Sequence, residues 1–63
     1  MTYDVVAVNI STQKVRILAA QKSEENAEAI ISMAVMRRGV GEEFYTEVPA
    51  GMYKEGDQWK GRE

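Results

Sequence analysis

The side chains that most often perform catalysis are missing from this sequence. Its 63 residues include no histidine and no cysteine. These two residue types supply the usual base at neutral pH, the usual thiolate nucleophile and the usual ligands of transition metals. The serines, Ser11, Ser23 and Ser32, therefore have no histidine to activate them. We expect no catalytic residue and no metal site.

Two acidic pairs and one glycine-containing motif are the remaining candidates for chemistry. The Glu-Glu pairs at 24–25 and 42–43 lie in a predicted first helical turn or on alternating faces of a strand. Such positions are typical of solvated carboxylates and not of an acid–base couple. The Gly-Val-Gly motif at 39–41 follows a predicted helix, so it does not aim a helix N-terminus at a phosphate. We expect a non-catalytic chain without a cofactor.

Side chains suited to binding a protein partner are more numerous. Tyr, Trp and Arg supply much of the binding energy at protein interfaces, and Met adapts to partners of different shape. We therefore predict a partner-binding surface made of aromatic, arginine, leucine and methionine side chains. The candidate residues are Tyr3, Arg16, Leu18, Tyr45, Trp59, Met33 and Met36.

An alternative is weak binding of nucleic acid through a small basic patch. The patch would use Lys14, Arg16, Arg37 and Arg38, with an aromatic side chain stacking on a base. The formal net charge of −2 and the neighbouring glutamates argue against this alternative, because attraction to phosphates depends on positive charge. The arginines at 37–38 also have a simpler role at the negative end of a helix dipole.

A helix over 23–40 is the element with the clearest boundaries. Ser23 is a favourable N-cap, and Gly39 is a favourable C′ residue after the two arginines. The expected core stripe has the i, i+3, i+4, i+7, i+8 spacing of one helical face, and it contains Ala27, Ile30, Ile31, Ala34 and Val35. A second apolar line contains Ala29, Met33 and Met36. This line is either the border of the core with one exposed methionine, or a contact surface for a partner or a second copy.

Three segments have the composition and alternation of β-strands. They span 3–10, 14–19 and 42–48. The first is apolar on both faces, which favours a central position and the strand order 2-1-3. The third strand then runs antiparallel to the first. Residues 49–63 are predicted to form either a short hairpin or an irregular tail that carries two aromatic residues.

The predicted fold class is α+β, a small two-layer ββαβ(β) domain in which one helix packs on one face of an antiparallel sheet. We place it in a single domain over residues 1–63, with a core at about 2–48. The helix is expected on the face that carries Val6, Val8, Val15, Ile17, Phe44 and Val48. The opposite face is then left uncovered, and it carries Tyr3, Val5, Ala7, Arg16, Leu18, Glu43, Tyr45 and Glu47.

The uncovered face has two interpretations. In the first it is an ordinary solvated face, on which Arg16 pairs with a glutamate across the strands and Tyr53 or Trp59 folds back over Val5 and Leu18. In the second it is a recognition surface for a protein partner.

The size and composition of the chain support a binding role over a catalytic one. A domain of 63 residues buries only roughly 60% of the surface that its unfolded form exposes, and without cysteine it depends on apolar packing or association. No segment has the pattern of a signal peptide or a membrane span, so we expect a cytoplasmic protein. These features resemble those of the short accessory proteins of bacteria and phages. The predicted function is a modulator that binds a larger protein, as a monomer or homodimer, and a structural subunit of a homo-oligomer is a further alternative.

Overall fold

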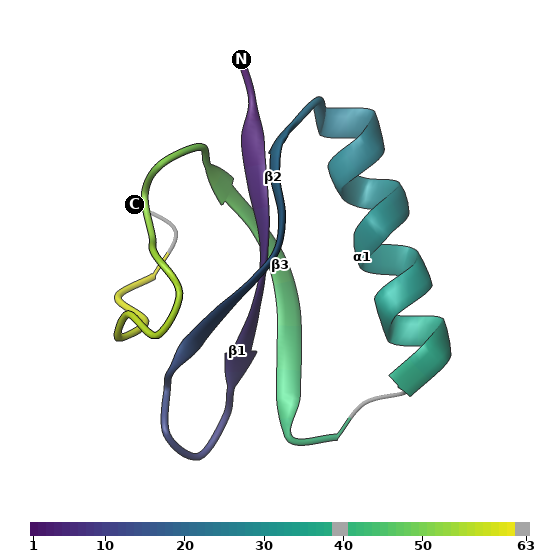
Figure 1. The fold of residues 1–63 in the computed structure, drawn as a ribbon. Coiled ribbons are helices and arrows are strands. Elements are labelled where there is room, and N and C mark those ends of the chain that lie inside the picture. The colour runs from purple at the N-terminus through teal and green to yellow at the C-terminus, as the bar shows by residue number, and fades with distance from the viewer. Residues whose placement is uncertain (39–40, 62–63) are drawn as a thin grey trace.

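The computed structural model describes residues 1–38 and 41–61, in which three strands and one helix are found (Figure 1). In chain order they are β1 (Tyr3–Asn9), β2 (Val15–Lys22), α1 (Glu24–Arg38) and β3 (Glu43–Pro49). The sheet is antiparallel with the order β2-β1-β3. The predicted α+β class, the central first strand and the strand order are confirmed.

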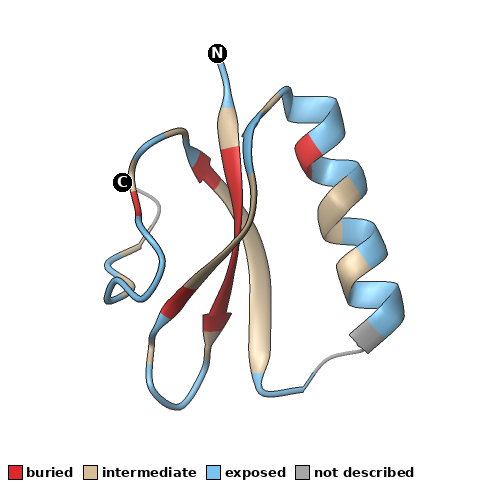
Figure 2. Ribbon diagram, viewed as in Figure 1, coloured by how far each residue is buried: buried red, intermediate tan, exposed pale blue. Residues whose placement is uncertain are grey.

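The central strand β1 is buried on both of its faces. Val5, Val6, Ala7 and Val8 have no solvent-exposed surface, and Figure 2 shows the resulting buried stretch in the middle of the sheet. Side chains of neighbouring strand residues point to opposite faces. Both faces of the sheet are therefore covered.

The helix and the C-terminal segment cover opposite faces of the sheet (Figure 1). The C-terminal segment packs on the face of Val6 and Val8, where the core also includes Val15, Val48 and Tyr53, with Ile17, Phe44, Met52 and Trp59 packed against it. The helix covers the other face, which carries Val5 and Ala7. The prediction that the helix takes the face of Val6 and Val8 was wrong. So was the expectation that the tail aromatics cover Val5 and Leu18.

The handedness of the chain explains why the helix lies on this face. β2 and β3 are both antiparallel to β1 and so parallel to each other, and α1 connects them across β1. Crossovers between parallel strands are right-handed in about 98% of cases. β1 directs the backbone N–H of Asn9, and by alternation those of Val5 and Ala7, toward β2. For L-residues in this orientation, the right-handed crossover places the helix over Val5 and Ala7.

The helix begins as predicted and packs through a narrower stripe than predicted. The Ser23 hydroxyl accepts a hydrogen bond from the Asn26 N–H at 3.3 Å, which confirms the N-cap. Ala27 is buried, and the other three inward residues, Ile30, Ile31 and Ala34, are partly buried. Val35 is 40% exposed and does not belong to the core, because it lies about 100° around the helix from Ala34. The predicted C-cap at Gly39 lies outside the described residues.

The C-terminal segment is an irregular layer and not a hairpin. Trp59 stacks on Tyr53 with ring centroids 5.2 Å apart and meets the Phe44 ring edge-on at 5.5 Å. A turn within this segment is closed by the Asp57 N–H, which donates to the Lys54 carbonyl at 3.0 Å. The core therefore extends beyond residue 48, since Tyr53 is one of its buried members.

Asp4 is a buried charge that joins the ends of the two outer strands. Asp4 as a whole residue is only 6% exposed. One carboxylate oxygen accepts from the Gln21 N–H at 2.9 Å and the other accepts from the Gly51 N–H at 3.0 Å. Both donors belong to residues with positive φ, 54° for Gln21 and 83° for Gly51. The carboxylate thus stabilises two backbone conformations that are otherwise rarely adopted.

We predict that Asp4→Ala lowers the free energy of unfolding by about 2 to 3 kcal/mol. Hydrogen bonds to a charged group contribute about 1.5 to 3 kcal/mol, and the substitution leaves two N–H donors without their acceptor. Urea denaturation followed by circular dichroism measures the loss. Glu25→Ala is the control, because Glu25 is exposed in the first turn of the helix. Equal urea midpoints for both variants would contradict the role assigned to Asp4.

We also predict that Trp59→Ala lowers the free energy of unfolding by about 2 kcal/mol. This is less than the 3 to 5 kcal/mol typical of a fully buried Trp, because Trp59 is partly exposed. The matched control is Met36→Ala, at a side chain that is 85% exposed. If the segment after β3 were a frayed tail, neither variant would shift the thermal unfolding midpoint.

Candidate interaction surface

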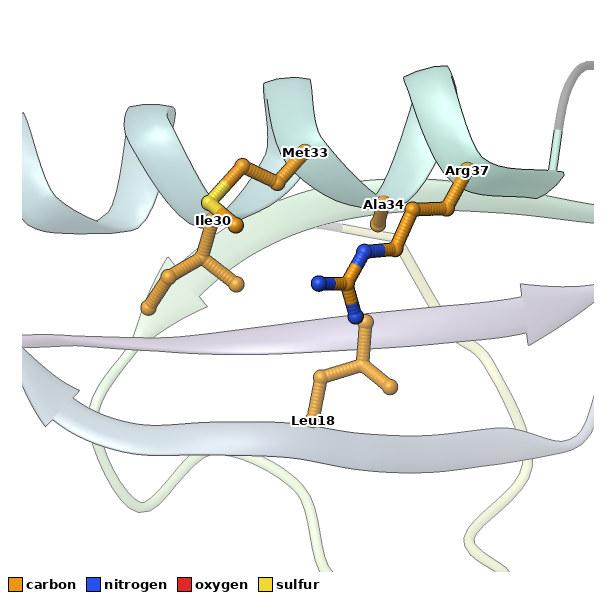
Figure 3. Close-up of a pocket in the computed structure, with 5 residues that line it drawn as sticks. All are labelled: Leu18, Ile30, Met33, Ala34 and Arg37. Atoms are coloured by element: carbon orange, nitrogen blue, oxygen red, sulfur yellow. The ribbon is translucent and has the colours of Figure 1, made fainter.

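An apolar groove lies between β2 and α1. It has a volume of about 280 Å³ and is lined by Leu18, Ile30, Met33, Ala34 and Arg37 (Figure 3). The four helical residues have the i, i+3, i+4, i+7 spacing of one helix face. This face is the side of α1 nearest β2, and it shares Ile30 and Ala34 with the stripe that packs on the sheet.

Leu18 reaches the groove at an irregularity in β2. Val6 pairs with Ile17 and the next residue of β1, Val5, pairs with Ala19, so Leu18 is one extra residue in the strand. Such a bulge bends the strand locally and redirects a side chain. Leu18 is therefore partly exposed at the wall of the groove instead of fully buried under the helix.

Arg37 supplies the positive charge at this groove. Figure 3 shows its guanidinium group extending from the helix toward Leu18, across the space between α1 and β2. Within residues 1–38 and 41–61, the structure gives Arg37 no hydrogen bond and no ion pair. The site thus combines apolar walls with a guanidinium that has no carboxylate partner in the described part of the chain.

Of the predicted partner-binding residues, the structure brings Leu18 and Met33 together in the groove. The others lie elsewhere. Met36 is exposed on the far side of α1, and Trp59 belongs to the opposite layer. By strand register, Tyr3 and Tyr45 lie on the helix-covered face of the sheet, where both are partly buried.

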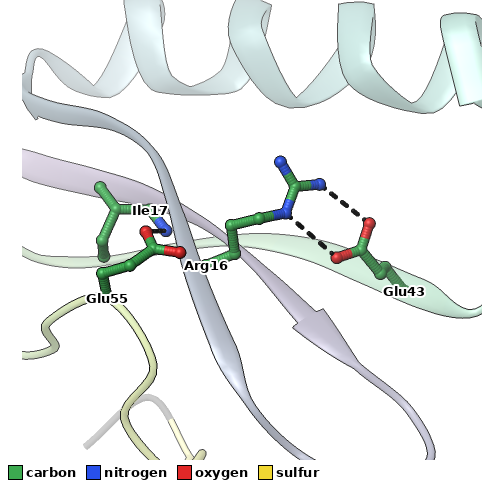
Figure 4. Close-up of polar contacts among 4 residues, drawn as sticks. All are labelled: Arg16, Ile17, Glu43 and Glu55. Atoms are coloured by element: carbon green, nitrogen blue, oxygen red, sulfur yellow. Dashed lines mark hydrogen bonds and ion pairs between the residues drawn. The ribbon is translucent and has the colours of Figure 1, made fainter.

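Arg16 forms an ion pair with Glu43 across the sheet. Its Nε and Nη2 donate to the two carboxylate oxygens at 3.4 and 3.0 Å. In Figure 4 this pair lies on the helix side of the sheet, while Glu55 reaches the Ile17 N–H from the other side. The hydrogen bond to Glu43 raises the pKa of Arg16, against an opposing effect of burial. The cross-strand pairing of Arg16 with a glutamate is confirmed.

This ion pair weakens the alternative of a basic patch. The charge of Arg16 is opposed by Glu43, and Lys14, the residue before β2, forms an isolated bridge with Gln58 of the C-terminal segment. Arg37 faces the groove, and the side chain of Arg38 lies outside the described residues. Binding of nucleic acid stays an untested alternative.

Sequence reasoning missed Ile30, Ala34 and Arg37 as groove residues. Ile30 and Ala34 were assigned to the core, and Arg37 to the helix terminus or the basic patch. Their common spacing was visible in the sequence. However, this line of residues lies beside β2 only because the helix covers the face of Val5 and Ala7, whereas the prediction placed the helix on the opposite face.

A second depression involves only the C-terminal segment. It has a volume of about 220 Å³ and is lined by Met52, Tyr53, Asp57, Gln58 and Lys60. Among the described residues, no group of three or more His, Cys, Asp or Glu side chains is arranged to hold a metal ion. No helix in this part of the chain has the length and hydrophobicity needed to cross a membrane.

Comparisons of the chain with protein-family models, with curated protein sequences and with solved structures found no match.

We predict a coupling free energy of about 0.5 to 1 kcal/mol between Arg16 and Glu43. Partly exposed ion pairs contribute in this range because water screens them. A double-mutant cycle with Arg16→Met, Glu43→Gln and the double variant measures it by urea denaturation. The coupling should fall in high salt. A coupling of zero at low salt would show that the pair does not contribute to stability.

Proposed function

We propose that this chain is a non-catalytic protein-binding module whose groove between β2 and α1 takes an apolar segment of a protein partner that carries a carboxylate. The observation that carries the proposal is the combination of Leu18, Ile30, Met33 and Ala34 as walls with the guanidinium of Arg37. Burial of apolar surface drives association, at roughly 25 cal/mol per Å². A carboxylate on the partner would complement Arg37.

The size of the groove favours side chains of a protein over a cofactor. Sites for small molecules usually enclose most of their ligand, whereas this groove, whose volume of about 280 Å³ is at the lower limit of such sites, is partly open to solvent. Met33 is 54% exposed at its rim. A flexible methionine there can adjust to the shape of the side chain that it covers.

The proposal predicts which peptides the protein selects. Random linear dodecapeptides displayed on phage are panned against the immobilised 63-residue chain. We expect enrichment of large apolar residues together with Asp or Glu, and binding of the selected peptides should depend on the groove. Met33→Glu should weaken this binding by about tenfold or more, because it places a charge among apolar contacts and opposes the peptide carboxylate.

Met36→Glu is the matched control, since it introduces the same charge on the same helix at a residue that is 85% exposed and outside the groove. Arg37→Met should reduce the preference for acidic peptides while leaving apolar selection in place. Peptides that bind the Met33→Glu and Met36→Glu variants equally well would refute the groove as the binding site.

A further inference from the structure

The two outer edges of the sheet differ in whether other parts of the chain cover their backbone groups. The edge of β2 is covered by the C-terminal segment at Val15 and Ile17. The Val15 N–H donates to the Asp57 carbonyl, and the Val15 carbonyl accepts from the Gly56 N–H, both at 2.8 Å. The Ile17 N–H donates to the Glu55 carboxylate at 2.9 Å. An uncovered edge would present these groups to any extended segment, so the cover prevents pairing there.

Among the described residues the N–H groups of Tyr45 and Glu47 at the outer edge of β3 have no such cover, although the Glu47 carbonyl accepts from the Thr46 hydroxyl at 3.4 Å. The Ile10 N–H donates to the Glu42 carbonyl, and the Ala50 N–H donates to the Thr2 carbonyl. These hydrogen bonds show that the even-numbered residues between 42 and 50 direct their backbone groups toward β1. Antiparallel pairing alternates, so Tyr45 and Glu47 direct theirs outward. No described residue accepts from either N–H. The edge ends at Pro49, which has no N–H.

Glu47 belongs to this outer strand, and by strand register its partly buried side chain lies on the helix-covered face of the sheet. Its Oε2 is buried, and no hydrogen-bond donor reaches it within the described part of the chain. A buried polar atom without a partner is costly, and more so when it belongs to a carboxylate. The negative charge of Glu47 is therefore left without a hydrogen-bond donor at this oxygen among the described residues.

We propose that the outer edge of β3 binds an extended segment of a protein partner, which adds to the sheet as a further strand and places a Lys or Arg side chain against Glu47. Backbone groups of Tyr45 and Glu47 provide affinity without regard to sequence, as in other cases of strand addition. Glu47 provides selectivity for a cation.

Two pairings of β3 with a second copy of this chain place carboxylates opposite each other. If two β3 strands paired antiparallel about Tyr45, Glu47 of one copy would face Glu43 of the other. Parallel pairing would place Glu47 beside Glu47. In neither arrangement does Oε2 receive a donor, and carboxylates facing each other destabilise the pair.

This inference does not depend on the groove. The groove lies beside β2, whereas the proposed edge is β3, and these are the two outer strands of the sheet. A substitution at one surface leaves the other intact. The failure of either proposal is therefore distinguishable from the failure of the other.

The experiment uses the ¹⁵N-labelled chain and the peptide acetyl-Thr-Val-Lys-Val-Lys-Val-Thr-amide, with a matched peptide in which both lysines are glutamates. We expect the lysine peptide to shift the amide signals of Tyr45 and Glu47 and to slow their hydrogen exchange by about tenfold or more at saturation. The glutamate peptide should do neither. Glu47→Gln should weaken binding of the lysine peptide by about fivefold or more, because it removes the charge but keeps the shape.

Glu42→Gln is the control, because it makes the same chemical change at an exposed residue whose carbonyl bonds to Ile10. Urea midpoints establish that both variants are folded. Three results would overturn the proposal: no shift at millimolar lysine peptide, equal binding of both peptides, or shifts confined to Leu18 and Met33. Protection of Tyr45 without peptide, rising with protein concentration, would overturn it in favour of a second copy.

Discussion

The rest of the structure depends on the burial of β1 on both of its faces. Four consecutive residues, Val5, Val6, Ala7 and Val8, have no exposed surface, so each face of the sheet needs its own cover. The described chain has one helix, which covers one face, and the segment after β3 covers the other (Figure 2). The irregular C-terminal segment is thus a structural layer. In a chain this short, little apolar surface remains for a larger core.

Fixing that second layer requires polar contacts as well as apolar ones. A segment without regular structure must find partners for its backbone groups outside a ladder of its own. It finds them at the edge of β2, where Glu55 and Asp57 meet outward-facing backbone groups, and at Asp4, whose carboxylate accepts from Gly51. These contacts also cover an edge that would otherwise be open to unwanted pairing. One segment therefore completes the core and protects β2.

Much of the fold was predictable from residues, while the sites were predictable only in part. Alternation and capping correctly predicted the strands, their order and the start of the helix at Ser23. They did not identify the covered face, because both faces of β1 are apolar and hydrophobicity alone does not distinguish them. Crossover handedness does distinguish them, and applying it would have placed Ile30 and Arg37 beside Leu18. The Glu47 Oε2 atom is buried without a hydrogen-bond donor among the described residues. Its burial results from side-chain packing, which no sequence pattern predicts.

The net charge of −2 conceals an uneven distribution of charge between the two outer strands. Lys14 precedes β2 and Lys22 ends it, with the Glu55 carboxylate also at this edge, whereas Glu42 precedes β3 and Glu43, paired with Arg16, and Glu47 lie within it. Charge complementarity controls which partner approaches and how fast it associates. If both proposals hold, an acidic partner of the Arg37 groove would be disfavoured at β3, and a basic strand that suits Glu47 would be disfavoured at Arg37. The two proposals together predict two contact surfaces of opposite charge, each suited to a different segment.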